Sequence, residues 1–61
     1  MNCKYTIAEI DSNGFRHNLF IVETIEDVFD YIHEYEEAVH MKGKYEVNVS
    51  KGSTTIGNFR I

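Results

Sequence analysis

The sequence predicts an α+β fold of the order ββαββ, in which a four-stranded antiparallel sheet carries one helix packed across one face. Two features lead to this prediction. A stripe of apolar residues at helical spacing lies between residues 24 and 42, and a pair of β-rich runs joined by turn residues lies on each side of it. No linker, repeat or low-complexity stretch interrupts the sequence, so we expect residues 1–61 to form a single small α+β domain. The strand order cannot be read from this pattern.

The first hairpin is expected over residues 2–22. Two runs of alternating or β-rich sequence, from Asn2 to Ile10 and from residue 15 to Val22, are separated by the turn cluster Asp-Ser-Asn-Gly. A three-residue loop at 12–14 collects the apolar side chains on one face, whereas a two-residue loop mixes apolar and polar side chains on both faces. The expected cross-strand pairs are Ile7 with Leu19 and Tyr5 with Ile21.

The helix is expected from Ile25 to Met41. Thr24 is a suitable N-cap, because its hydroxyl can accept a hydrogen bond from the amide of Asp27, and Gly43 is expected to end the helix in the left-handed conformation. One side of this helix should face the core, which places Phe29 in the core. The predicted apolar stripe consists of Ile25, Val28, Phe29, Ile32, Tyr35 and Val39.

The second hairpin is expected from residues 44–50 and 54–61, with the turn at Lys51 and Gly52. The first of these strands places Tyr45, Val47 and Val49 on one face. In the second, Ile56 has the opposite parity to Phe59 and Ile61, so a regular strand cannot direct all three inward. A bulge at Gly57 would reconcile them.

Composition narrows the class of protein. The net charge is −4, which argues against non-specific binding to a nucleic acid backbone, since Lys and Arg clusters supply that binding. The single cysteine, Cys3, cannot form an internal disulfide, and this fits a reducing compartment. The sequence shows neither a signal-peptide pattern nor an apolar run of membrane-spanning length, so we expect a cytoplasmic protein.

Acidic residues dominate the rest of the helix. Seven of the ten acids fall between residues 23 and 37, a stretch without Lys or Arg. Those near the helix start are favoured by the helix dipole, but the later ones have no such explanation and no Lys or Arg one turn away. They form either a solvated face or a surface for a basic partner. The residues expected to bind such a partner are Asp27, Asp30, Tyr31, Glu34 and Glu37, with Tyr31 mostly exposed.

The sequence offers little for catalysis. His33, Glu36, Glu37 and His40 form an H-x-x-E-E-x-x-H pattern that could bind Zn²⁺ or Ni²⁺, but it lacks the histidine pair of a metalloprotease helix. Glu36 lies near the middle of the apolar stripe and therefore needs a partner, for which His40, Arg16 and Arg60 are candidates. We expect no catalytic residues, no metal and no cofactor, because no nucleophile, acid pair or phosphate-binding glycine loop is present.

These observations favour a small acidic protein-binding module. Its helix would occlude a basic partner surface, for example one that binds nucleic acid, as small phage or mobile-element proteins do when they inhibit host defence. This is an analogy of size and charge. One alternative is a nucleic-acid-binding module that uses the open face of the sheet, with Lys4, Arg16, Lys44 and Arg60 as cations and Phe20 as a stacking residue. A second is a structural subunit that forms a homodimer through a sheet edge or through Phe20 and Ile10 on that face.

Overall fold

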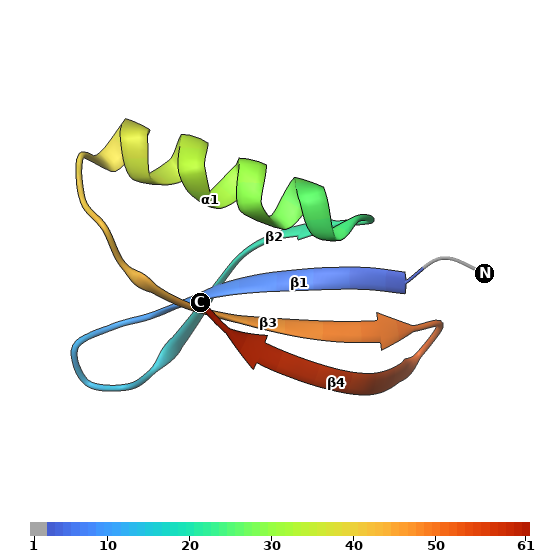
Figure 1. Ribbon diagram of the computed structural model, residues 1–61. Helices are drawn as coiled ribbons and strands as arrows, with labels where there is room; N and C mark the ends of the chain where they lie inside the picture. The colour runs from blue at the N-terminus through green and yellow to red at the C-terminus, as the bar shows by residue number, and fades with distance from the viewer. Residues whose placement is uncertain (1–2) are drawn as a thin grey trace.

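The computed structural model describes residues 3–61 and shows one sheet and one helix (Figure 1). The strands pair antiparallel in the order β2-β1-β3-β4, which confirms the predicted ββαββ fold. The predicted start of the first strand, Asn2, lies outside the described residues. No helix in the described part of the chain is long and apolar enough to cross a membrane. The elements are β1 (Cys3–Ile10), β2 (Arg16–Val22), α1 (Ile25–Val39), β3 (Lys44–Lys51) and β4 (Thr54–Arg60).

The first hairpin has the expected three-residue loop. The Gly14 N–H donates to the Asp11 carbonyl and the Asp11 N–H donates to the Phe15 carbonyl, both at 3.0 Å. Gly14 has a φ of 86°, a conformation that glycine adopts without steric cost.

The predicted pairing beyond this loop is wrong, because the register shifts by one residue between Ile7 and Ala8. Ile7 pairs with Phe20, and Tyr5 pairs with Val22. Leu19 is the extra residue of a bulge, which lets Leu19 and Phe20 both contact residues on the helix side of the sheet.

The helix begins as predicted and ends early. Thr24 Oγ1 accepts from the Asp27 N–H at 3.1 Å, so the N-cap is confirmed. The predicted end at Met41 and the predicted stop at Gly43 are wrong: α1 ends at Val39, and His40 takes the left-handed conformation with φ 56°. Gly43 lies instead in a narrow space between two side chains. A Cβ there would lie 3.2 Å from both a Glu9 carboxylate oxygen and the Tyr45 hydroxyl, so the backbone passes close to these side chains.

The core lies between α1 and the sheet. Its buried residues are Ile7, Val28, Ile32, Tyr45 and Val47. The prediction that Phe29 belongs to this core is wrong, because its side chain is 52% exposed. α1 lies closest to β1 and β2 (Figure 1), and Tyr45 and Val47 of β3 are also buried beneath it.

The second hairpin also contains a bulge. Val49 pairs with Gly57 and Ser50 pairs with Thr55, so Ile56 is the extra residue, directly beside the predicted position. Phe59 packs against the core, as the predicted bulge would allow, whereas Ile56 remains 57% exposed. The bulge therefore turns only part of the apolar set of β4 inward.

Candidate functional site

The four carboxylates predicted to bind a partner lie together on α1. Asp27, Asp30, Glu34 and Glu37 are all exposed and follow one another at intervals of three or four residues, which places them on one side of a helix. We call these four residues the acidic face. Glu37 Oε1 lies 3.1 Å from His33 Nε2, in a pair whose side chains are 71% and 75% exposed. Within residues 3–61, no ion pair engages Asp27, Asp30 or Glu34.

Tyr31 does not lie as expected. It is partly buried and packs against the core, because β2 lies beneath this side of α1. Its ring stacks on Phe20 with centroids 5.0 Å apart and on Tyr35 with centroids 6.3 Å apart. Phe20 is 54% exposed, so the exposed aromatic beside the acidic face comes from β2. The expectation that Phe20 lies on the open face of the sheet is therefore also wrong.

The opposite face of the sheet is cationic. Residues directly opposite one another in antiparallel strands point to the same face, and the register places four of the chain's six Lys and Arg residues on the face away from α1. These residues are Lys4, Arg16, Lys44 and Arg60. We call this side the open face.

Glu46 is the acidic residue among these cations. Its Oε1 lies 2.7 Å from Arg16 Nη1, and its Oε2 lies 3.4 Å from Arg60 Nε. The hydrogen bond from Arg16 is the main reason why the pKa of Glu46 is lowered, and Arg60 lowers it further. Arg16 and Arg60 thus bind Glu46 instead of Glu36.

Glu36 has no cationic partner in the described structure. Its Oε2 accepts hydrogen bonds from the Gly43 N–H at 2.9 Å and from the Tyr45 hydroxyl at 3.1 Å. Burial of Tyr45, together with its hydrogen bond to Glu36, raises the pKa of Tyr45. The carboxylate within the apolar stripe therefore fixes the loop after α1 to the start of β3.

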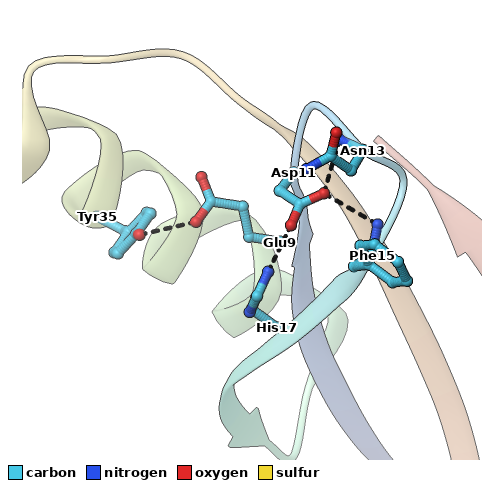
Figure 2. Close-up of polar contacts among 6 residues, drawn as sticks. All are labelled: Glu9, Asp11, Asn13, Phe15, His17 and Tyr35. Atoms are coloured by element: carbon cyan, nitrogen blue, oxygen red, sulfur yellow. Dashed lines mark hydrogen bonds and ion pairs between the residues drawn. The ribbon is translucent and has the colours of Figure 1, made fainter.

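A second tyrosine–glutamate pair joins the helix to β1. The Tyr35 hydroxyl donates to Glu9 Oε1 at 3.0 Å (Figure 2), and this bond is the main reason why the pKa of Tyr35 is raised. Together with the bond between Glu36 and Tyr45, it ties the C-terminal half of α1 to the sheet. These two glutamates are thus occupied by contacts that hold the layers together.

Asp11 organises the first turn (Figure 2). Its Oδ1 accepts from the backbone N–H groups of Asn13 and Phe15 at 2.8 and 3.0 Å, and its Oδ2 lies 2.7 Å from His17 Nε2. The contact with His17 is the main reason why the pKa of Asp11 is lowered. This exposed cluster satisfies turn amides and has a local structural role.

The histidine–glutamate pattern on α1 does not converge on one point. His33, Glu36, Glu37 and His40 line an open hollow of about 230 Å³ together with Met41 and Lys42. Glu36 already accepts two hydrogen bonds, and Glu37 is paired with His33. Among the residues that the structure describes, no three His, Cys, Asp or Glu side chains are placed to hold a metal ion.

Sequence reasoning missed one feature beside the acidic face and one on the open face of the sheet. The stack of Phe20 on Tyr31 depends on the bulge in β2, and the bracketing of Glu46 by two arginines depends on strand order. The spacing of Tyr31 and Tyr35, one turn apart, was an available signal for the second aromatic contact. Comparisons of this chain with protein-family models, curated proteins and solved structures found no match.

Proposed function

We propose that the acidic face binds a basic surface on a partner protein and occludes it. The observation that supports this proposal is the separation of charge between the two sides of the molecule. The acidic face lies on α1, while four of the six cationic side chains lie beyond the sheet. Among the described residues, no Lys or Arg forms an ion pair with these carboxylates.

Distance keeps the two sets of charges apart. A helix packed on a sheet places its outer side chains more than about 10 Å from the far face of the sheet. This distance exceeds the Debye length at 0.1 M salt, which is about 10 Å. Attraction between the acidic and open faces is thus largely screened. A partner that places Lys or Arg directly against the acidic face avoids this screening, and complementary potentials also speed the encounter.

The stacked pair of Phe20 and Tyr31 borders this surface. Tyr31 follows Asp27 by four residues and precedes Glu34 by three, so both carboxylates are its neighbours on the helix. Stacking restricts the Phe20 ring, so less conformational entropy is lost when a partner covers it. Aromatic side chains of this kind are frequent anchors in protein interfaces.

A partner with a nucleic-acid-binding surface fits this chemistry, because such surfaces are rich in Lys and Arg. The protein would then act as an inhibitor that competes with the nucleic acid. The acidic face spans ten residue steps of helix, about 15 Å, and so covers one cationic patch rather than a long groove. We place this action in the cytoplasm, where the unpaired thiol of Cys3 is stable.

The experiment is an affinity capture from a lysate of the organism that encodes the chain. The bait is compared with the variant Asp30→Asn, Glu34→Gln, Glu37→Gln and with the control Ser53→Lys, Thr55→Lys, Asn58→Lys. Both triple variants change the net charge by +3, and all six positions are exposed. We expect a basic protein to be captured by the wild type and the control but not by the neutralised variant. Equal capture by all three baits would contradict the proposal.

The open face favours a second function, which is binding of single-stranded nucleic acid. Lys4, Arg16, Lys44 and Arg60 share this face. However, Glu46 engages two of these cations, and Phe20, the expected stacking residue, lies on the other side. Fluorescence anisotropy with a labelled single strand distinguishes the two functions. The alternative requires that the strand binds, that Lys4→Ala and Lys44→Ala weaken this binding, and that neutralisation of the acidic face leaves it unchanged.

A further inference from the structure

Phe20 is the end ring of a row of aromatic side chains. Its ring lies at 10° to the ring of Tyr31, which in turn lies at 15° to the ring of Tyr35. Among the ring pairs of residues 3–61, Phe20 takes part only in the pair with Tyr31, so Tyr31 lies between the other two rings. Tyr31 therefore covers one face of the Phe20 ring. The exposed 54% of the Phe20 side chain belongs to its other face and its edge.

Asp27 lies on the same side of Tyr31 as this exposed ring face. Tyr35 follows Tyr31 by one turn toward the C-terminal end of α1, so Phe20, on the opposite side of Tyr31, lies toward the N-terminal end. Asp27 precedes Tyr31 by one turn, and the Cβ atoms of such neighbours are about 5–6 Å apart. The exposed ring face and the carboxylate are therefore neighbours in the first half of α1.

The position of β2 makes both groups accessible to a partner. β2 is an edge strand of the sheet and lies beneath this flank of α1 (Figure 1). Asp27 is exposed, and within the described chain no ion pair engages it. Four of the six Lys and Arg residues lie on the open face, on the opposite side of the sheet. This site thus offers an aromatic face and a negative charge, and a complementary ligand is a cation.

The geometry of the site favours one of the two basic side chains. A guanidinium is planar, so it can stack on a ring while the N–H groups at its edge donate two parallel hydrogen bonds to a carboxylate. The ammonium of lysine is a compact and strongly hydrated charge without such a plane. A cation contributes most when it lies within about 6 Å of the ring centroid. Arginine can therefore satisfy the ring and the carboxylate together.

We propose that Phe20 and Asp27 bind an arginine side chain of the partner protein. The guanidinium stacks on the exposed face of Phe20, and its N–H groups donate to the Asp27 carboxylate. This inference rests on the function proposed for the acidic face and names the residue type that binds at its N-terminal end. The other carboxylates of the acidic face contribute charge, which Lys and Arg satisfy equally.

Calorimetric titration with peptides of eight arginines or eight lysines tests this site, because the two probes carry the same charge. The titrations use about 0.05 M salt, at which exposed charges are weakly screened. Phe20→Leu keeps an apolar side chain but removes the ring, and Asp27→Asn removes the charge. Phe15→Leu is the matched control, because Phe15 is 67% exposed and lies in the first turn.

We expect the wild type and Phe15→Leu to bind the arginine peptide at least fivefold more tightly than the lysine peptide. In Phe20→Leu and in Asp27→Asn the two affinities should lie within about twofold of each other, while the circular dichroism stays that of the wild type. Nuclear magnetic resonance supplies a second signature. The wild type should shift side-chain protons of the arginine peptide upfield, because they lie over the Phe20 ring, and Asp27→Asn should weaken this shift.

The outcomes separate this inference from the proposed function. Equal affinity of the wild type for the two peptides overturns the arginine site but leaves the charge-based function standing. A preference for arginine that survives in Phe20→Leu or in Asp27→Asn also overturns the site, as does the absence of an upfield shift with the wild type. A wild type that binds neither peptide contradicts the proposed function as well.

Discussion

The hydroxyl of Tyr45 donates a hydrogen bond to Glu36 at 3.1 Å and so joins the last turn of α1 to the first buried side chain of β3. The Tyr45 side chain is only 1% exposed, and Glu36 also accepts from the Gly43 N–H. The Glu36 carboxylate thus accepts a hydrogen bond from a buried hydroxyl and also holds the loop that joins α1 to β3.

Removal of this carboxylate should destabilise the fold. Glu36→Ala leaves the Tyr45 hydroxyl without its partner, and an unpaired buried polar group costs about 1–3 kcal/mol. Glu37→Ala is the matched control, because Glu37 is exposed and should change the free energy of unfolding by less than about 0.5 kcal/mol. Urea denaturation measures both variants. Equal stability of the two would show that the bond to Tyr45 has no net effect.

Glu46 should make stability depend on acidic pH. Its arginine partners lower its pKa in the folded state, so the unfolded chain binds the proton more readily. The resulting stabilisation is present above the unfolded pKa of about 4.3 and is lost as pH falls through the folded pKa. Glu46→Gln should therefore flatten the fall in unfolding free energy below about pH 4.5. Part of the dependence of unfolding free energy on pH should remain in Glu46→Gln, because the pKa of Asp11 is also lowered in the folded state. An unchanged slope in Glu46→Gln would contradict this account.

The core assignment predicts a large difference between two apolar residues of α1. Ile32 is 6% exposed, so Ile32→Ala should cost about 2–5 kcal/mol of unfolding free energy. Phe29 is 52% exposed, so Phe29→Ala should cost clearly less. Thermal melts compare the two. A larger loss for Phe29→Ala than for Ile32→Ala would place Phe29 in the core.

The fold was readable from the sequence because its signals are local. The Thr24 cap, the three-four spacing of Val28 and Ile32, and the Asp-Ser-Asn-Gly turn each act within a few residues. Register was only partly readable. The bulge at Leu19 depends on which side chains pack beneath α1, and no spacing within β2 reveals this.

The candidate site was readable to the same extent. The acidic face follows from helical periodicity alone, so its exposure was predicted correctly. The burial of Tyr31 and the exposure of Phe29 both depend on which strands lie beneath α1. That placement depends on strand order, which the alternation of apolar residues does not encode.

The proposed binding of the acidic face depends on charge complementarity with its partner. Its most direct test is a calorimetric titration of the captured basic partner with the wild type, with Asp30→Asn, Glu34→Gln, Glu37→Gln, and with the control Ser53→Lys, Thr55→Lys, Asn58→Lys. The Debye length falls from about 10 Å at 0.1 M salt to about 3 Å at 1 M. We expect wild-type and control affinities to fall by at least tenfold over this range, and the neutralised variant to bind weakly at both. Wild-type binding that does not change with salt, together with equal binding by the neutralised variant, would contradict charge complementarity at the acidic face.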